Sequence, residues 1–285
     1  MTTTAWIFPG QGSQKIGMGS DLFEQSEHQE RLKLAEKILG WSVPEICQHP
    51  EDKISQTLYT QPSLYVVESL LVDQLKKQGQ SPDYVAGHSL GEYVALYVAG
   101  VFDFETGLKL VQCRAELMNS SVGGQMAALI GFDREQLDQQ IQQTPNIVLA
   151  NDNSAAQVVI SGTPEAVDHV LANIKVKRAV KLNVSGAFHS PLMHRSATQF
   201  QQVLDGIAFN NAKIPVLSNV DPTPTTDATL LKQRLTQQMT GSVRWREICL
   251  QLSILGVTQV VEIGPGNVLT GLMKRTCPEI LLQNI

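Results

Sequence analysis

The sequence predicts an α/β fold in which a parallel sheet is interrupted by a smaller unit. Strand-like runs alternate with longer helical patterns over residues 1–124 and again over 186–285, and such alternation is typical of a parallel sheet. Two of the strand-like runs lead into glycine-rich turns. Between 125 and 185 the elements become short, which indicates a separate small domain.

The first part of the chain reads as strand, turn and helix. The strand-like run TAWIFPG leads into the loop GQGSQKIGMG and then into an amphipathic stretch over 21–39. A helical pattern covers 62–78. A short apolar strand over 84–87 then leads directly into Ser89 and an alanine-rich helix. We therefore expect the first two strands to be neighbours in a parallel sheet.

The small domain has the order strand, helix, strand, strand, helix, strand, which is typical of a ferredoxin-like unit. Its segments are MAALIGF, DREQLDQQIQQ, NIVLAND, QVVISGT, PEAVDHVLANI and AVKLNVS. The larger pattern then resumes with a helix over 190–205, a strand in IPVLSN, helices within 227–255, the strand VTQVVEIG, and a final helix and strand. We expect a larger domain of residues 1–124 and 186–285, with the small domain of 125–185 inserted in it.

Composition excludes several classes of protein. The chain has 285 residues and a net charge of -5, which disfavours general attraction to nucleic acid or to anionic membranes. Its most apolar stretch, 93–102, is far shorter than the ~20 residues of a membrane span. The start MTTTAWIFPG has no signal-peptide pattern, and the four cysteines form no CxxC pair that would suggest zinc or a disulfide framework. We expect a cytoplasmic protein without a metal site.

Gly87, Ser89 and Gly91 form a G-x-S-x-G pattern between a predicted strand and a predicted helix. This is the context of a nucleophile elbow, where a sharp turn exposes a hydroxyl and the following helix directs its first amides at the reacting carbonyl. An ordinary glycine turn between a strand and a helix would show the same letters. The pattern alone leaves both interpretations open.

His189, in SGAFHSPLM directly after the last strand of the small domain, is the best candidate for a base. A structural histidine is the alternative, and no acidic residue lies in a motif that would complete a triad. Arg114, in VQCRAELM, falls near the buried side of its predicted helix. It would serve either as a clamp for a substrate carboxylate or as half of an internal salt bridge with Glu92.

The loops PGQGSQ and GPG each follow a predicted strand, but neither fits a phosphate-binding signature. The spacing of Gly10, Gly12 and Gly17 also differs from that of a dinucleotide loop, which disfavours a nicotinamide cofactor. PGQGSQ is better explained as a loop whose main-chain amides donate hydrogen bonds near the nucleophile. The GPG turn is read as a strand terminator.

Six motifs occur together in one order: FPGQGSQ, GHSLGEY, Arg114 in its helix, AFHSPLM, VRW and EIGPGNVLTGL. Together they resemble the malonyl-CoA:acyl carrier protein transacylases of type II fatty acid synthesis, over practically the whole chain. The resemblance implies an α/β hydrolase-like core with an inserted ferredoxin-like subdomain. It also implies that no bound cofactor is needed.

The resemblance also implies roles for individual residues. Ser89 would be the acylated nucleophile and His189 its general base, with the backbone amides of Gln11 and Leu90 as the oxyanion hole. Arg114 would hold the free malonyl carboxylate.

Three further positions follow from the same motifs. The main-chain carbonyl of Gln238 would orient the histidine, and Phe188 resembles the malonyl-selecting form of its motif. The segment NDNSAAQ departs from the common pattern of the family, so Asn153 is only weakly indicated as a substrate-pocket residue.

The expected reaction moves a malonyl group from malonyl-CoA to the phosphopantetheine thiol of acyl carrier protein, through a serine ester. A serine esterase or thioesterase is the main alternative, and an inactive carrier-binding module is a third. We expect a monomer that docks its acidic carrier on cationic clusters on either side of the active-site mouth. A solvated charged face is the alternative explanation of those clusters. The clusters are Lys175, Lys177, Arg178 and Lys181 in the small domain, and Lys274 and Arg275 near the end of the chain.

Overall fold

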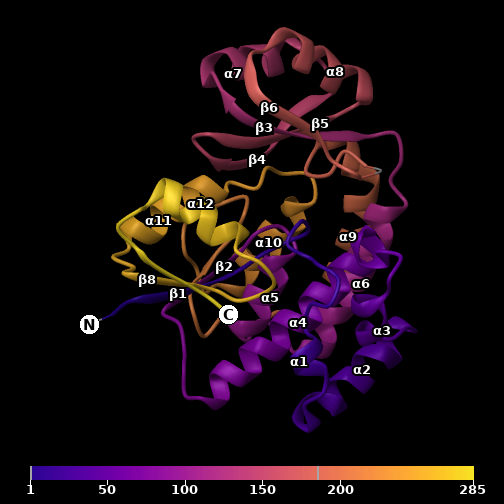
Figure 1. Ribbon diagram of the computed structural model, residues 1–285, viewed down its shortest axis with the longest axis vertical. Coiled ribbons are helices and arrows are strands. Elements are labelled where there is room, and N and C mark those ends of the chain that lie inside the picture. Colours follow the sequence, from indigo (N-terminus) through magenta and orange to yellow (C-terminus); the bar gives the residue numbers. More distant parts are fainter. Residues whose placement is uncertain (1, 185) are drawn as a thin grey trace.

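The computed structural model describes residues 2–184 and 186–285, and it contains two separate sheets (Figure 1). The larger sheet has five strands in the order β7-β2-β1-β8-β9, and all of its pairings are parallel. Its strands are β1 (Thr4–Phe8), β2 (Tyr84–Gly87), β7 (Val216–Leu217), β8 (Gln259–Glu262) and β9 (Leu281–Asn284). The predicted parallel sheet is therefore confirmed.

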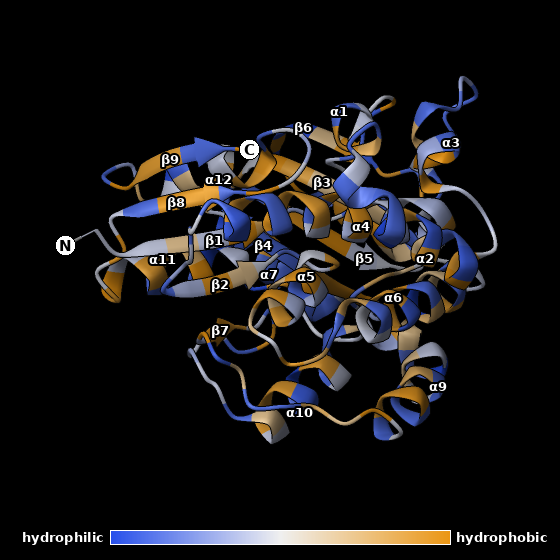
Figure 2. Cartoon of the chain, turned by 90° about the horizontal axis from the view of Figure 1, so that it is seen from below, coloured by the Kyte–Doolittle hydropathy of each residue, from blue (hydrophilic) through white to orange (hydrophobic). Residues whose placement is uncertain are grey.

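Helices cover both faces of the larger sheet, and its central strand is apolar from Ala5 to Phe8. In β1, Trp6 and Phe8 belong to one hydrophobic cluster, whereas Ala5 and Ile7 belong to a second cluster on the other face. All four residues are at most 1% exposed. Figure 2 shows β9, β8, β1 and β2 side by side, with the middle of β8 coloured as hydrophobic. Burial on both faces explains the continuous apolar run in TAWIF.

The helices of the larger part follow the predicted order, except that α3 (Val43–Gln48) was not predicted and the stretch over 21–39 is two helices; several ends also differ. They are α1 (Ser20–Phe23), α2 (Gln29–Leu39), α3 (Val43–Gln48), α4 (Thr57–Lys77), α5 (Gly91–Val98), α6 (Phe104–Asn119), α9 (His194–Asp205), α10 (Ala228–Gln238), α11 (Trp245–Ile254) and α12 (Val268–Thr276). The amphipathic stretch over 21–39 is divided because Gln25 is extended, with ψ 127°, before a short 3₁₀ turn. Helix α4 begins before Pro62 and contains it.

The small sheet has the order β4-β5-β3-β6 with every neighbouring pair antiparallel. Its elements are β3 (Gln125–Phe132), α7 (Arg134–Gln143), β4 (Ile147–Ser154), β5 (Gln157–Gly162), α8 (Pro164–Asn173) and β6 (Val176–Lys181). Leu137 of α7 and Val167 of α8 pack with strand residues such as Leu129 in a third hydrophobic cluster. The ferredoxin-like order and pairing are thus as predicted. Residue 185, the expected domain limit, lies outside the described residues, and the limits stay a prediction.

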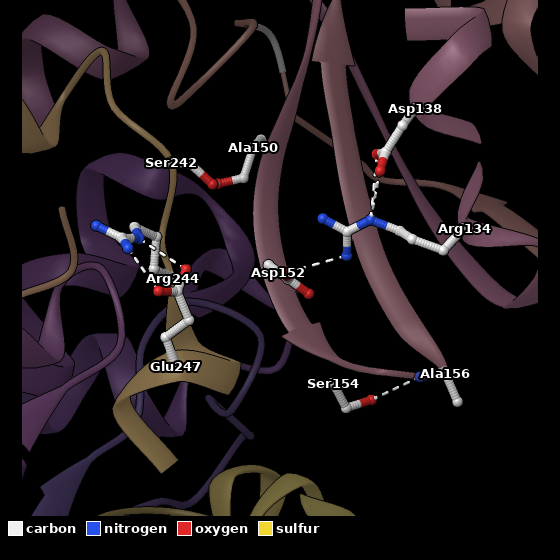
Figure 3. Close-up of polar contacts among 9 residues, drawn as sticks. All are labelled: Arg134, Asp138, Ala150, Asp152, Ser154, Ala156, Ser242, Arg244 and Glu247. Carbon is white, nitrogen blue, oxygen red and sulfur yellow. Dashed lines mark hydrogen bonds and ion pairs between the residues drawn. The ribbon is translucent and has the colours of Figure 1, made fainter. Parts of the chain in front are cut away.

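The segment that follows α10 lies along β4 and joins the two parts of the molecule (Figure 3). Val243 donates its amide to Ala150 O at 2.8 Å and accepts from the Asp152 amide at 2.9 Å. The Ser242 hydroxyl also donates to Ala150 O, at 3.2 Å. On the far side of β4, Arg134 pairs with Asp152. These hydrogen bonds connect the small sheet to the segment immediately downstream of Gln238.

Candidate active site

The nucleophile elbow lies where β2 ends and α5 begins. Ser89 has φ 52°, a left-handed conformation that is uncommon for a residue with a side chain. A Cβ on Gly91 would lie 2.0 Å from Phe8 O, and a Cβ on Gly87 would lie 1.9 Å from the Gly91 carbonyl carbon. The two flanking glycines therefore allow the backbone of the elbow to close tightly against β1.

The structure brings His189 to Ser89. The Ser89 hydroxyl lies 2.8 Å from His189 Nε2, and His189 Nδ1 lies 2.9 Å from Gln238 O and 3.2 Å from Gly241 O. Because carbonyl oxygens only accept, Nδ1 carries the ring proton and Nε2 is free to accept from the serine. His189 also has a positive φ, 56°. Two strained residues thus face each other at one site, which is where strain is typically retained.

The imidazole of His189 is neutral at neutral pH. Burial, together with the nearby positive charge of Arg114, lowers its pKa to about 3, and the two carbonyl acceptors oppose this shift only in part. A neutral imidazole with its Nε2 lone pair directed at a hydroxyl is the form that accepts a proton. The arrangement suits general-base activation of Ser89.

Arg114 enters the same site from α6 and is 1% exposed. Its Nη1 donates to Gln61 Oε1 at 2.5 Å, and its Nη2 donates to Ser89 Oγ at 2.9 Å and to Gln238 Oε1 at 3.1 Å. Within the described part of the chain no carboxylate lies within 4.0 Å of the guanidinium. The alternative of a salt bridge with Glu92 is therefore wrong, because the Glu92 carboxylate is turned towards other donors.

Glu92 and Asn219 brace the elbow, and sequence reasoning did not assign them this role. The side chain of Asn219 accepts from the Ser89 backbone amide at Oδ1, at 2.7 Å, and donates from Nδ2 to Gly87 O, at 2.6 Å. Glu92 Oε2 in turn accepts from the Asn219 amide at 3.1 Å and from Gln238 Nε2 at 2.7 Å. The signal for Asn219 was its place at the end of IPVLSN, because the carboxyl ends of parallel strands meet at one edge of the sheet.

Gln11 and Leu90, the predicted oxyanion donors, both line the cavity that contains Ser89. Gln11 follows β1, and Leu90 immediately precedes α5. Among the described residues, neither backbone amide donates to an acceptor of the protein. The side chain of Gln11 is held at Oε1 by the Thr57 hydroxyl, at 2.8 Å. Both amides are therefore available to a ligand.

The catalytic cavity is small, at about 90 Å³. Its wall contains six of the predicted residues together with side chains of the small domain and of α4 and α6. The lining residues are Gln11, Gln61, His88, Ser89, Leu90, Arg114, Met118, Met126, Asn151, Leu182, Val184, Phe188 and His189. A neighbouring cavity of about 230 Å³ shares Gln11, His88, Asn151 and Leu182 with it and extends between the two parts of the molecule.

Asn153 lines this second cavity, and its Oδ1 lies 2.8 Å from His88 Nε2. Gln238, by contrast, is fully buried beneath the catalytic cavity. A larger hollow of about 620 Å³ near α2 and α4 contains charged side chains such as Arg31 and Asp73, but its lining includes no serine or cysteine. The smaller cavity, by contrast, contains Ser89 and His189 at hydrogen-bonding distance.

The predicted docking residues lie outside both cavities. Lys177 and Arg178 are exposed on β6, whereas Lys274 and Arg275 are exposed at the end of α12. Strand β6 is one edge of the small sheet, and α12 packs near β4, the other edge. The two clusters are thus separated by the width of the small sheet.

A strained serine on a strand-to-helix turn, a neutral histidine and two free amides define a serine-dependent acyl-transfer enzyme on an α/β core. Residues 5–283 match the acyl transferase domain family, and the chain belongs to that family.

Similar proteins cover almost the whole chain. The malonyl CoA-acyl carrier protein transacylase of Synechocystis sp. is 57% identical over 99% of this chain and 96% of its own length. The crystal structure of the malonyl-CoA:ACP transacylase of Synechocystis sp. PCC 6803 has a TM-score of 0.98 and covers 100% of this chain and 97% of that one. A type II polyketide synthase acyl-carrier protein in complex with its malonyl-transacylase contains a chain 36% identical, with a TM-score of 0.93 and coverage of 100% and 96%. Within the described residues, no helix has the length and apolar character needed to cross a membrane.

Proposed function

We propose that the protein transfers the malonyl group of malonyl-CoA to the phosphopantetheine thiol of an acyl carrier protein. The observation that carries this proposal is Arg114, a buried cation that has no acidic partner in the described chain and lies 2.9 Å from Ser89 Oγ. A buried guanidinium without a counter-ion favours a ligand that brings a carboxylate. Malonyl thioesters provide one close to the reacting carbonyl. The relatives named above carry the same activity in their names.

In the first half-reaction, His189 Nε2 takes the hydroxyl proton of Ser89 while Oγ forms a bond to the thioester carbonyl carbon. The carbonyl oxygen becomes an oxyanion that accepts from the amides of Gln11 and Leu90. The C–S bond then breaks, and the imidazolium returns its proton to the coenzyme A thiolate. The product is a malonyl ester of Ser89, with neutral His189 restored.

In the second half-reaction, the carrier thiol gives its proton to His189 and its sulfur attacks the ester carbonyl. The oxyanion uses the same two amides, and the C–Oγ bond breaks as His189 returns the proton to Ser89. Arg114 would hold the malonyl carboxylate through both steps. The carbonyls of Gln238 and Gly241 keep the imidazole in the required tautomer in place of a triad acid, with less stabilisation of the imidazolium than a carboxylate would give.

A hydrolase would use the same serine, base and amides, with water in place of the thiol. We favour transfer because the relatives are transacylases and because the catalytic cavity is small and half apolar in its lining, which limits water at the ester. Release of free malonate at a rate similar to carrier loading would contradict this choice.

The second cavity, with Asn153 in its wall, is the proposed path of the pantetheine arm, and Phe188 is proposed to limit the acyl group at its α-carbon. Lys177, Arg178, Lys274 and Arg275 are proposed to dock the acidic carrier. We further propose that the protein acts as a cytoplasmic monomer in fatty acid biosynthesis.

Intact-mass measurement after addition of malonyl-CoA alone tests the proposal. Wild type should gain one malonyl group on the peptide that contains Ser89, and Ser89→Ala should gain none. Arg114→Ala should lose malonyl transfer and gain relative acetyl transfer, because an unpaired buried charge costs on the order of 3 to 5 kcal/mol. An unmodified wild type, or an Arg114→Ala protein with a normal melting profile and an unchanged malonyl-to-acetyl ratio of kcat/KM, would refute the assignment.

A further inference from the structure

The guanidinium of Arg114 is surrounded by neutral oxygen atoms. Gln61 Oε1 accepts from Nη1, while Ser89 Oγ and Gln238 Oε1 accept from Nη2. Gln61 comes from α4 and Gln238 from the end of α10, so two helices far apart in sequence each direct an amide oxygen at the same cation. Both glutamines are at most 1% exposed. Neutral acceptors orient the cation without forming an ion pair, and Glu92 attracts it only from beyond 4.0 Å.

The orientation of each amide is set by what its nitrogen contacts. Gln238 Nε2 donates to Ser89 O at 2.9 Å and to Glu92 Oε2 at 2.7 Å. A flipped amide would place its oxygen against these two acceptors and its NH₂ group against the guanidinium. Gln61 Nε2 donates to the thioether sulfur of Met118, at 3.3 Å. Glu92 therefore reaches Arg114 through the Gln238 amide, with an uncharged group between the two charges.

We propose that Gln61, together with Gln238, is a specificity-determining positioning residue. It orients Arg114 with a neutral oxygen and so preserves a full positive charge for the carboxylate of the substrate. A glutamate at position 61 would have nearly the same shape and would neutralise that charge within the protein. The substrate carboxylate would then have to compete with an internal ion pair. This inference rests on the proposed malonyl transfer and deepens it.

Gln61 is the better of the two positions for a test. Its Nε2 contacts a weak acceptor, so the change from nitrogen to oxygen in Gln61→Glu removes little else. In Gln238→Glu, by contrast, a second carboxylate would lie against Glu92, and the two would share a proton.

The test measures kcat/KM for acylation of Ser89 by malonyl-CoA and by acetyl-CoA. Gln61→Glu should lower the malonyl-to-acetyl ratio about 10- to 100-fold, mainly through KM for malonyl-CoA, because the guanidinium is already paired. Gln61→Met, which removes the acceptor and adds no charge, should keep most of the ratio. Gln78→Glu makes the same change of net charge at the exposed C-terminal cap of α4 and should leave the ratio unchanged.

A second variant keeps the test decisive if Gln61→Glu does not fold. The double substitution Glu92→Gln with Gln238→Glu keeps the net charge constant and moves the carboxylate next to Arg114. It also loses the bond from Gln238 Nε2 to Ser89 O, so the ratio is read only in protein with a normal melting profile. The double variant should also lower the ratio. A malonyl-to-acetyl ratio equal to that of wild type, in a folded Gln61→Glu protein or in the double variant, would overturn the inference. So would a Gln61→Met protein that loses as much of this ratio as Gln61→Glu does. If Arg114→Ala loses malonyl preference while these variants keep it, only the inference fails; if wild type has no malonyl preference, the proposed function fails.

Discussion

The two sheets of the molecule differ in what covers them and in what they contribute to the cavity. The parallel sheet is buried on both faces, and the segments that follow its strands include Gln11, Ser89 and Asn219. The antiparallel sheet is covered by α7 and α8 on one face, whereas Met126 and the nearby Leu182 reach the catalytic cavity. Its edge strand β6 is largely exposed. The parallel sheet therefore positions Ser89 and the two proposed amide donors, whereas the antiparallel sheet supplies part of the cavity wall and has one exposed edge strand.

We therefore expect changes in the two parts to have different effects. Changes at the ends of the parallel strands and in the loops packed on them should affect bond formation. Changes on or beside the small sheet should affect which acyl group or carrier is accepted. Four predictions test this expectation.

His189→Ala should reduce the rate of Ser89 acylation by ~10² to 10⁴, because a positioned general base contributes about that much. Rapid-quench mass spectrometry with malonyl-CoA measures the rate, and circular dichroism confirms the fold. A near-normal rate would show that another residue acts as the base.

Gly91→Ala and Gly131→Ala compare one glycine from each part. The new Cβ at Gly91 would meet the backbone of Phe8 and Pro9, whereas at Gly131 it would meet the flexible side chain of Lys177. We expect Gly91→Ala to lower the free energy of unfolding by more than about 3 kcal/mol, beyond the usual range for overpacking. Gly131→Ala should lower the free energy of unfolding by about 1 to 2 kcal/mol, because the backbone at this position has φ 65°. Urea denaturation measures both, and equal losses would contradict the greater rigidity of the elbow.

Phe188→Ser should weaken discrimination against methylmalonyl-CoA. The ring is 5% exposed and lines the catalytic cavity, where it would overlap a 2-methyl branch at a cost of about 1 to 3 kcal/mol, or roughly 10- to 100-fold in kcat/KM. Competition between the two thioesters gives the ratio directly. If the variant discriminates as strongly as wild type, the ring is not the filter.

Lys177→Glu combined with Lys274→Glu should raise KM for the carrier protein about 3- to 10-fold at low salt, since each exposed charge pair contributes under about 1 kcal/mol. Acylation by malonyl-CoA alone should not change. A carrier KM equal to that of wild type at low ionic strength would show that these lysines form an ordinary solvated face.

The sequence alone predicts those parts of the structure that depend on residues close together in the chain. The strand, turn and helix around Ser89 and the order of elements in the small domain follow from local patterns, and both are present. The bracing groups were not predictable in this way, because Asn219 meets Gly87 across 132 positions and Gln61 meets Arg114 across 53. Helix α4 begins before Pro62, and a local pattern that treats proline as a start signal places the start too late.

The pairing of β1 with both β2 and β8 also has a consequence for synthesis of the chain. Ala5 pairs with Tyr84 on one side and with Val260 on the other, so the centre of the sheet remains incomplete until the ribosome has passed residue 262. The carbonyl groups that accept from His189 Nδ1 belong to Gln238 and Gly241, which are synthesised well after Ser89. We therefore expect a nascent chain that ends before Gln238 to carry Ser89 without an oriented imidazole beside it, and to gain its proposed reactivity only when the chain is nearly complete.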